Sequence, residues 1–205
     1  MKLYLSRRAP NPRRVAWFLA EKEADDIEIV DLDVLKGEHR DPAFREQFGV
    51  ALLPALELDD GTRLSESIAI CRYLESLHPE PNLFGRDAKE SAVIEMWTRR
   101  AELMAANPLM NAVRHSHPAL AVLETQIPEV AEFSRKQAEK ALALFDAQLK
   151  DHPFIAGERI AMADIILACG LDFARLARFS PPEEFAHLRR WRDAMMARPA
   201  AAAGV

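Results

Sequence analysis

The stretch LLPALELDDGTRLSESIAI, residues 52–70, carries most of the information about the fold. An apolar run crosses a proline and reaches Asp60-Gly61, and a second apolar run follows. Aspartate-glycine between two such runs predicts a β-hairpin. Ser65 is the expected N-cap of a following helix, because its hydroxyl can accept a bond from a free N–H group. A helix start can hold an anion, so the stretch predicts a site for a small peptide-like acid.

The same stretch resembles the glutathione-binding half of the cytosolic glutathione transferases. The resemblance implies that the Leu53-Pro54 peptide bond is cis and that the main chain of Leu53 pairs with the cysteinyl part of glutathione. It also implies that Glu66 and Ser67 hold the γ-glutamyl group. The alternative is an ordinary β-hairpin that leads into a surface helix, since X-Pro bonds are cis in only about one case in twenty.

The composition is that of an ordinary globular protein, with 205 residues, 49% of them hydrophobic and 29% charged. No apolar run approaches the roughly 18 residues of a membrane span, and the N-terminus does not read as a signal peptide. Cys71 and Cys169 are too far apart for a CxxC redox pair. We therefore expect a cytoplasmic protein that does not bind a membrane.

The net charge of −5 argues against nucleic acid as a partner. Arg7, Arg8, Arg13 and Arg14 nevertheless form a positive neighbourhood around the start of the first predicted helix. Two interpretations stay open. The arginines form a solvated surface, or they attract an anionic ligand such as glutathione.

The N-terminal part alternates strand and helix patterns. We expect strands at residues 3–5 and 27–32, the second with Ile27 and Ile29 alternating inward, and the hairpin at 52–65. Helices are expected from the Pro-rich turn to about Glu23, as a brief piece near Asp41, and from Glu66 to Leu77. The order βαβαββα predicts an α/β thioredoxin-like domain with a mixed sheet over residues 1–78.

The rest of the chain contains no strand pattern. Residues 79–86, rich in Pro and Gly, read as a linker, and residues 87–205 as an all-helical domain that contains the second-substrate site. The expected helices cover residues 88–114, interrupted near Asn107-Pro108, and residues 128–150, 160–177 and 185–196. No internal repeat is present.

Residues 154–165, FIAGERIAMADI, resemble the helix-capping segment of the same family. Asp164 would bond back to the cap residue, and Ile160 with Ile165 would form a hydrophobic staple. Ala161 stands where a serine or threonine is usual, which weakens the cap by about 1 kcal/mol.

Glutathione chemistry requires a thiolate, and the family places a Tyr, Ser or Cys donor at the position of Ala9. Alanine has no donor. The Thr-Pro-Asn turn of the bacterial nu class resembles Ala9-Pro10-Asn11, so thiolate stabilisation is assigned to Asn11, assisted by main-chain N–H groups of the first turn. Asn11 as a mere helix cap is an equal alternative. Ser6 is a weaker catalytic candidate, and Tyr4 reads as a core residue.

Other contacts follow from the resemblance. His39 matches a loop that touches the glycyl end of glutathione, although a lone loop histidine is often merely exposed. Leu52 replaces the usual cation that holds the glycine carboxylate. A second-substrate pocket is expected on residues three or four apart, which are Met104, Asn107, Met110, Asn111 and Arg114. The alternative is that the methionines belong to the core or to a dimer interface.

No metal is expected, because His115 and His117 have no third ligand nearby. Three functions remain open. The first is conjugation of glutathione, as co-substrate, to small hydrophobic electrophiles in detoxification. The second is glutathione-dependent disulfide reduction, and the third is a non-catalytic glutathione- or ligand-binding module. The family also implies a homodimer.

Overall fold

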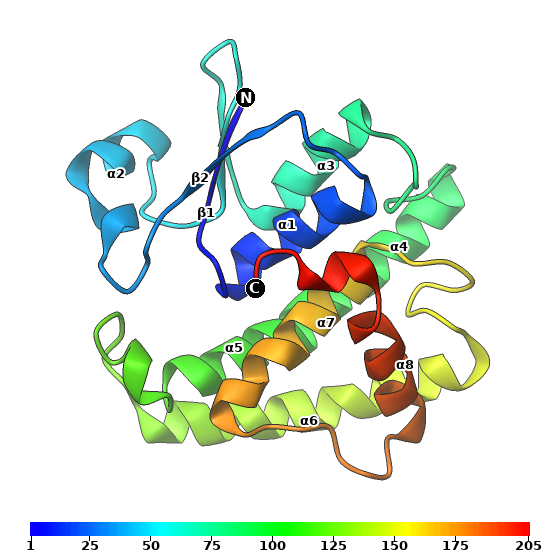
Figure 1. Cartoon of the computed structure of the whole chain (residues 1–205). Helices are drawn as coiled ribbons and strands as arrows, with labels where there is room; N and C mark the ends of the chain where they lie inside the picture. Colours follow the sequence, from blue (N-terminus) through cyan, green and yellow to red (C-terminus); the bar gives the residue numbers. More distant parts are fainter. The chain divides into compact units, whose positions relative to one another are not determined.

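The computed structural model describes residues 1–205, which divide into two compact units. Unit 1 contains Met1–Pro81 together with the last four residues, Ala202–Val205, and unit 2 contains Asn82–Ala201. All four strands lie in unit 1, and unit 2 is helical (Figure 1). This arrangement confirms the predicted fold class, a thioredoxin-like α/β part followed by an all-α part.

The sheet of unit 1 is mixed, with the strand order β2-β1-β3-β4. β1 runs parallel to β2 and antiparallel to β3, and β3 pairs antiparallel with β4 across the predicted hairpin. The strands are β1 (Lys2–Leu5), β2 (Glu28–Asp31), β3 (Ala55–Glu57) and β4 (Arg63–Ser65). Leu3 and Leu56 face each other in the register and are completely buried, so the two central strands form the core of the sheet. Ile29, expected to face inward, is 51% exposed because β2 is an edge strand.

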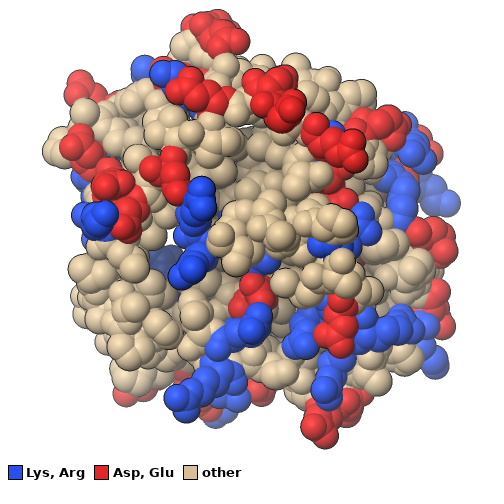
Figure 2. Space-filling model, viewed as in Figure 1, with Lys and Arg blue, Asp and Glu red and all other residues tan.

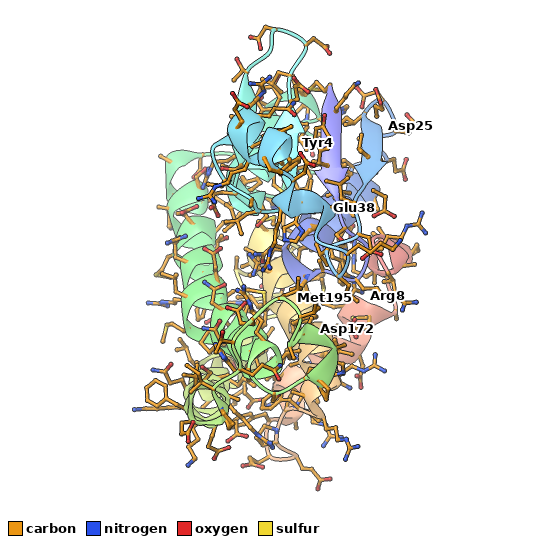
Figure 3. The ribbon with its side chains drawn as sticks, turned by 90° about the vertical axis from the view of Figure 1, so that its left-hand side faces the viewer. Tyr4, Arg8, Asp25, Glu38, Asp172 and Met195 are labelled. Carbon is orange, nitrogen blue, oxygen red and sulfur yellow. The ribbon has the colours of Figure 1, made fainter.

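Three helices complete unit 1: α1 (Pro10–Glu21), α2 (Pro42–Phe48) and α3 (Ser67–Leu77). α1 and α3 pack side by side (Figure 1), and Val15, Trp17 and Phe18 of α1 are completely buried. Tyr4 of β1 lies against α2 (Figure 3), with its ring 5.6 Å from that of Phe44 and 5.3 Å from that of Phe48.

The start of α3 differs from the expectation. Ser65 is not the N-cap, because its main chain is held in the sheet opposite Ala55. Glu66 takes the cap position with φ 71° and ψ 116°, and Ser67 is the first helical residue. A positive φ is uncommon for glutamate and strains the backbone at this residue. Such strained residues are concentrated at functional positions.

Unit 2 consists of helices joined by turns. They are α4 (Ala88–Arg100), the π-helical stretch η2 (Ala101–Ala106), α5 (Asn107–Arg114), α6 (Pro128–Asp151), α7 (Met162–Ala174) and α8 (Ala186–Met196), with short 3₁₀ turns at Pro118–Leu120, Arg175–Ala177 and Pro199–Ala202. The expected interruption near Pro108 is therefore the π-helical stretch before it. Proline supplies no N–H for the carbonyl four residues earlier, so regular α-helix pairing cannot run through this point.

α7 is the central helix of unit 2, and most of its residues are completely buried. Gly170 of α7 lies against η2, where an added Cβ would be 2.8 Å from the Cβ of Ala106. The close approach of the two helices therefore depends on a missing side chain.

The start of α7 is fastened by Asp164, which is completely buried. Its carboxylate accepts hydrogen bonds from the N–H of Ala161 (2.9 Å), from the N–H of Ile155 (2.9 Å) and from Nε1 of Trp191 (2.8 Å). The predicted bond back to the cap residue is confirmed, and Ala161 provides no side-chain bond. Burial raises the pKa of Asp164 to about 6 against these bonds.

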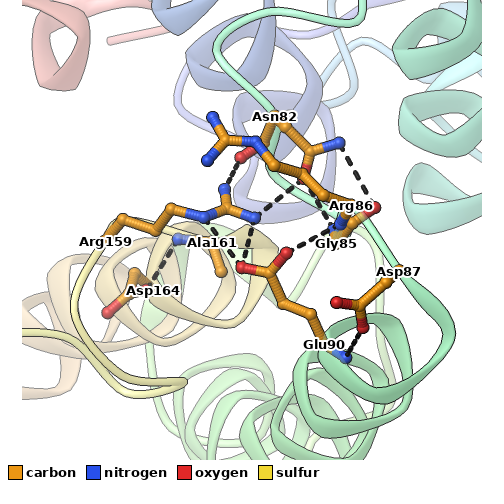
Figure 4. A network of polar contacts seen from close by, with 8 residues as sticks. All are labelled: Asn82, Gly85, Arg86, Asp87, Glu90, Arg159, Ala161 and Asp164. Atoms are coloured by element: carbon orange, nitrogen blue, oxygen red, sulfur yellow. Dashed lines mark hydrogen bonds and ion pairs between the residues drawn. The ribbon is translucent and has the colours of Figure 1, made fainter.

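The second half of the predicted linker is held within unit 2 by Arg159 (Figure 4). Its guanidinium donates to the carboxylate of Glu90 at 2.6 Å and to Oδ1 of Asn82 at 2.9 Å, and it also bonds to the Asn82 carbonyl. The N–H of Arg86 donates to Glu90 at 2.7 Å, and this bond, followed by Arg159, lowers the pKa of Glu90. Asp87 caps α4 through the N–H of Glu90. This segment is therefore structural.

Candidate functional site

The first turn of α3 presents an anion-binding surface. The first helical bond of α3 runs from the N–H of Ile70 to the carbonyl of Glu66 (3.0 Å). The N–H groups of Ser67, Ile68 and Ala69 form no hydrogen bond within the protein. Unpaired N–H groups at a helix start, reinforced by the helix dipole, attract a carboxylate. The exposed carboxylate of Glu66 beside them can hold an ammonium group. Together these groups match the two charges of an α-amino acid.

A free peptide edge lies next to this surface in unit 1. The Leu53-Pro54 peptide bond is cis, as predicted. The ladder between β1 and β3 begins only at Ala55, and neither main-chain polar group of Leu53 is hydrogen-bonded. Leu53 can therefore pair with an extended peptide by main-chain hydrogen bonds.

In the first turn of α1, the polar groups that lack a hydrogen bond belong to Asn11. Pro10 and Pro12 have no N–H, and the N–H of Arg13 donates to the carbonyl of Ala9 at 3.0 Å. The sequence predicted that several main-chain N–H groups of this turn assist thiolate stabilisation. Only one of them, the N–H of Asn11, is free of a hydrogen-bond partner. The side-chain Oδ1 of Asn11 is buried and also lacks a hydrogen bond.

Asn11 does not cap α1. Ala9 holds the N-cap position without a side-chain bond, and Asn11 is the second helical residue. The helix-cap alternative for Asn11 is therefore wrong. The carboxamide of Asn11 contains both an oxygen acceptor and an N–H donor, so a ligand can meet either group.

The other two candidates for the thiol position lie differently. Ser6 is buried and lines a hollow of about 450 Å³ together with Arg13, Ile29 and Gly204. This hollow lies toward β2, whereas the residues around Pro54 and Ser67 belong to the β3–β4 side of the sheet. The hydroxyl of Tyr4 donates to Glu57 at 3.3 Å, so it is used within the fold.

The four arginines near α1 separate into two pairs. Arg7 and Arg8 are exposed; Arg7 forms an ion pair with Asp31 (3.0 Å), and the main-chain N–H of Arg8 donates to Gly204 (2.8 Å). The second pair is buried, so it is not a solvated surface. The guanidinium of Arg13 lies over the ring of Trp17, 5.6 Å from its centroid.

Arg14 reaches the predicted ligand site. Its side chain is buried, and Nη1 donates to the Oγ of Ser67 at 3.3 Å. From the sequence, Arg14 is one of four arginines that attract an anionic ligand in one interpretation, but its contact with Ser67 is not predicted, although a signal for it exists. Arg14 precedes Phe18 by four residues and so lies on the apolar face of the helix, where a charge needs a specific partner.

His39 is not the exposed loop histidine of the alternative interpretation. It lies in the 3₁₀ turn η1 (Glu38–Arg40) and is buried, with Nδ1 lacking a hydrogen bond. Burial, followed by the nearby charge of Arg40, lowers the pKa of His39, so the ring is neutral at pH 7. Leu52 is 56% exposed and offers no charge.

The five residues expected in the second-substrate pocket lie in η2 and α5 of unit 2. Met104, Asn111 and Arg114 are exposed, Asn107 is half-buried and Met110 is buried. The residues therefore do not share one exposed face, because the π-helical turn shifts the helical phase between Met104 and α5. Arg114 also forms an ion pair with Glu124 at 2.8 Å.

No group of three or more His, Cys, Asp or Glu side chains is arranged to hold a metal ion. His115 uses Nδ1 to accept a bond from the N–H of Ile127 (3.2 Å). No helix is long and apolar enough to cross a membrane.

A second hollow, of about 460 Å³, lies in unit 2 beside α8. Lys150, His152, Arg190 and Arg198 contribute to its lining, and Figure 2 shows Lys and Arg side chains gathered over α8 among scattered carboxylates. None of the residues expected in the second-substrate pocket lines it.

Comparison with known proteins places these features in a family. The model of the glutathione S-transferase N-terminal domain matches residues 9–77, and that of the C-terminal domain matches residues 105–199. Glutathione S-transferase 2 of Saccharomyces cerevisiae is 36% identical over 203 residues, covering 97% of this chain and 87% of that protein.

A solved structure extends the likeness to the whole fold. The glutathione S-transferase domain-containing protein of Marinobacter aquaeolei VT8 is 37% identical, with a TM-score of 0.92 over 98% of this chain and 99% of that one. A probable glutathione S-transferase GSTF2 of Oryza sativa is 30% identical over 97% of this chain and 93% of its own length. The chain belongs to the glutathione S-transferase family, as the sequence resemblance predicted.

Proposed function

We propose that the chain conjugates the thiolate of glutathione to small hydrophobic electrophiles. The relatives support glutathione transferase activity in general. The observation that carries the specific proposal is Asn11, whose main-chain N–H and side-chain amide N–H form no hydrogen bond within the protein at the start of α1. A thiolate accepts hydrogen bonds, so these free donors can stabilise it.

Glutathione binding follows from unit 1. The α-carboxylate of the γ-glutamyl residue accepts hydrogen bonds from the free N–H groups of α3 and from Ser67. The ammonium group of the same residue pairs with Glu66. The cysteinyl part pairs with the main chain of Leu53 beside Pro54. The buried Nδ1 of His39 is available to the glycyl end.

The thiol is activated by what stabilises its ionised form. A thiolate is the nucleophile, and a donor at the positive end of a helix lowers the pKa of a thiol. Asn11 supplies that donor through its N–H and its carboxamide, while Ser6 remains a second candidate. For the electrophile, unit 2 contains the expected second-substrate residues: the exposed and apolar Met104, the polar Asn107, Asn111 and Arg114, and the buried Met110. The enzyme acts as a homodimer in cytoplasmic detoxification.

Disulfide reduction through a protein thiol is disfavoured. Cys71 and Cys169 are both completely buried, and neither lies at the thiol position. A reductase activity would therefore use glutathione alone. Assays with a conjugation substrate and with a glutathione mixed disulfide separate conjugation, reduction and a non-catalytic binding role.

Substitution of Ser67 tests the glutathione site. Ser67→Ala removes a hydrogen bond to a charged group, and we expect a loss of roughly 1.5–3 kcal/mol in binding free energy. By calorimetry this corresponds to a dissociation constant raised about ten- to hundredfold. Ser65→Ala is the matched control, because Ser65 lies two residues earlier, in the sheet. The affinity of this variant for glutathione should stay within about twofold of the wild-type value. Equal affinities of the two variants would contradict the assignment.

A further inference from the structure

The hollow beside α8 has the size of a small-molecule site and an apolar wall. Its volume is about 460 Å³, and Trp191 and Met195 of α8 line it together with Phe154 from the loop before α7. Small-molecule sites have volumes of about 300–1,000 Å³ and are lined mainly by apolar and aromatic side chains. Methionine adapts to ligands of different shape. The hollow can therefore accept a ring system.

The ring of Trp191 is held in place by the fold. Trp191 is 2% exposed, and its Nε1 donates to the carboxylate of the buried Asp164 at 2.8 Å. This bond fixes the orientation of the indole ring before any ligand arrives. A preformed wall lowers the cost of ordering side chains on binding.

The polar part of the lining is mostly positive. Its basic residues are Lys150, His152, Arg190 and Arg198. Asp151 is the one carboxylate in the lining. The chain as a whole has a net charge of −5, so this hollow differs in sign from the protein around it. A hollow lined by one sign of charge concentrates ligands of the opposite sign.

Two of these cations are not neutralised within the protein. Nη2 of Arg190 donates to the main-chain carbonyl of Leu149 at 2.6 Å, which places the guanidinium at the end of α6. Neither Arg190 nor Lys150 forms an ion pair with a carboxylate. Both can therefore pair with an anionic group that enters the hollow.

We propose that this hollow binds a small aromatic anion, a ring system that carries a carboxylate or a sulfonate. The ring packs against Trp191 and Met195, and the anionic group pairs with Lys150 and Arg190. No residue of the candidate glutathione site and none of the five residues expected in the second-substrate pocket lines the hollow. The proposal is therefore independent of the proposed conjugation activity.

A matched pair of probes tests the wild-type protein. Anilinonaphthalene sulfonate has the ring system and the charge, and N-phenylnaphthylamine has the same rings without the sulfonate. In nitrogen NMR, the indole N–H resonance of Trp191 should shift as the sulfonate is added, whereas those of Trp17 and Trp97, which lie outside the hollow, should stay in place. The Kd read from this shift should be at least about tenfold lower for the sulfonate than for the neutral amine.

Substitutions of the two cations test the role of charge. Lys150→Gln and Arg190→Gln should each raise the Kd of the sulfonate about five- to tenfold and change that of the neutral amine less than about twofold. The matched controls are Lys140→Gln on α6 and Arg189→Gln on α8, because neither residue lines the hollow. Both controls should leave the two Kd values within about twofold of wild type.

Three results would overturn the proposal. The first is an unchanged Trp191 resonance with the sulfonate, or equal Kd values for the two probes. The second is displacement of the sulfonate by inorganic sulfate but not by chloride at equal ionic strength, since the hollow would then hold a free anion without a ring. The third is loss of the Trp191 shift at saturating glutathione, because the two sites would then not be separate.

Discussion

Asn11 is the residue on which the proposed thiolate stabilisation depends. Pro10 and Pro12 remove two of the N–H donors that a helix start normally offers, so one main-chain donor and one carboxamide remain. A helix start that binds anions through several N–H groups tolerates the loss of a single side chain. In the proposed site, thiolate stabilisation depends on Asn11 alone, so substitution of Asn11 should reduce activity strongly.

Asn11→Ala should lower kcat about ten- to hundredfold, the loss of one side-chain hydrogen bond to a charged group. The affinity for glutathione should change less, because the interaction is made with the ionised sulfur. The pKa of bound glutathione, followed by ultraviolet absorbance of the thiolate, should rise toward its free value. If rate and pKa both stay unchanged, thiolate stabilisation belongs to Ser6 or to the Asn11 main chain.

Charge should contribute little to the binding of the glycine carboxylate of glutathione. Leu52 is exposed and apolar, and the buried His39 is neutral at pH 7 because its pKa is lowered. The glycine ethyl ester of glutathione should therefore bind within about fivefold of glutathione at pH 7, the range of an exposed ionic contact. Competition binding measures this ratio.

The ratio of the affinities for glutathione and for its glycine ethyl ester should depend on pH through His39. As the pH falls below the ordinary histidine value, His39 gains charge only at its lowered pKa, and the preference for the free acid over the ester should then increase. His39→Gln should abolish that increase. A large preference for the free acid at pH 7 would show that another cation holds the carboxylate.

At the scale of elements, the contact of α7 with η2 depends on a glycine. An alanine is ordinarily favoured over glycine inside a helix by about 0.5–1 kcal/mol. At Gly170, however, the added Cβ would lie 2.8 Å from the Ala106 Cβ and 2.9 Å from its Cα. Gly170→Ala should therefore destabilise the protein by about 1–3 kcal/mol in denaturant unfolding, despite its better helix propensity.

Ala106→Gly in the same chain provides the matched test of the cause. Removing the opposing methyl group should recover part of the lost stability, whereas the single variant Ala106→Gly should be mildly destabilising. Additive effects of the two substitutions would show that the contact does not limit the packing of α7.

At the scale of the whole molecule, two buried groups make stability depend on pH in opposite directions. The pKa of Asp164 is raised to about 6 by burial, so the folded state binds a proton more readily than the unfolded state. The Asp164 contribution to the free energy of unfolding should therefore increase as the pH falls from about 6 to about 4, by on the order of 3 kcal/mol. The lowered pKa of His39 acts the other way and reduces stability as the pH falls below about 6.5.

Urea unfolding of the wild type, Asp164→Asn and His39→Gln across this pH range separates the two contributions. Asp164→Asn should remove the rise toward acid, and His39→Gln should make it steeper. Should Asp164→Asn fail to fold, carbon NMR of the Asp164 carboxyl group in the wild type gives its pKa directly. A value near 4 would contradict the expected linkage.

The fold follows from signals that are local in the chain. Asp60-Gly61 between apolar runs predicts the hairpin, and Asp164 three residues after Ala161 predicts the bond at the start of α7. Each depends on residues close in sequence, for which propensity and hydrogen-bond geometry suffice. The two prolines around Asn11 were equally visible, and their consequence for the free N–H groups could have been drawn from the sequence.

Tertiary structure decided what depends on partners distant in the chain. Ser65 is held in the sheet by Ala55, which moves the start of α3 to Ser67. Arg14 meets the Ser67 hydroxyl across 53 positions, and His39 becomes buried although its own segment is polar. Burial and charge pairing are properties of the packed core and not of a segment. The sequence by itself therefore determined the family and predicted the ligand class, while the electrostatics of the candidate glutathione site arose only when α1 and α3 packed together.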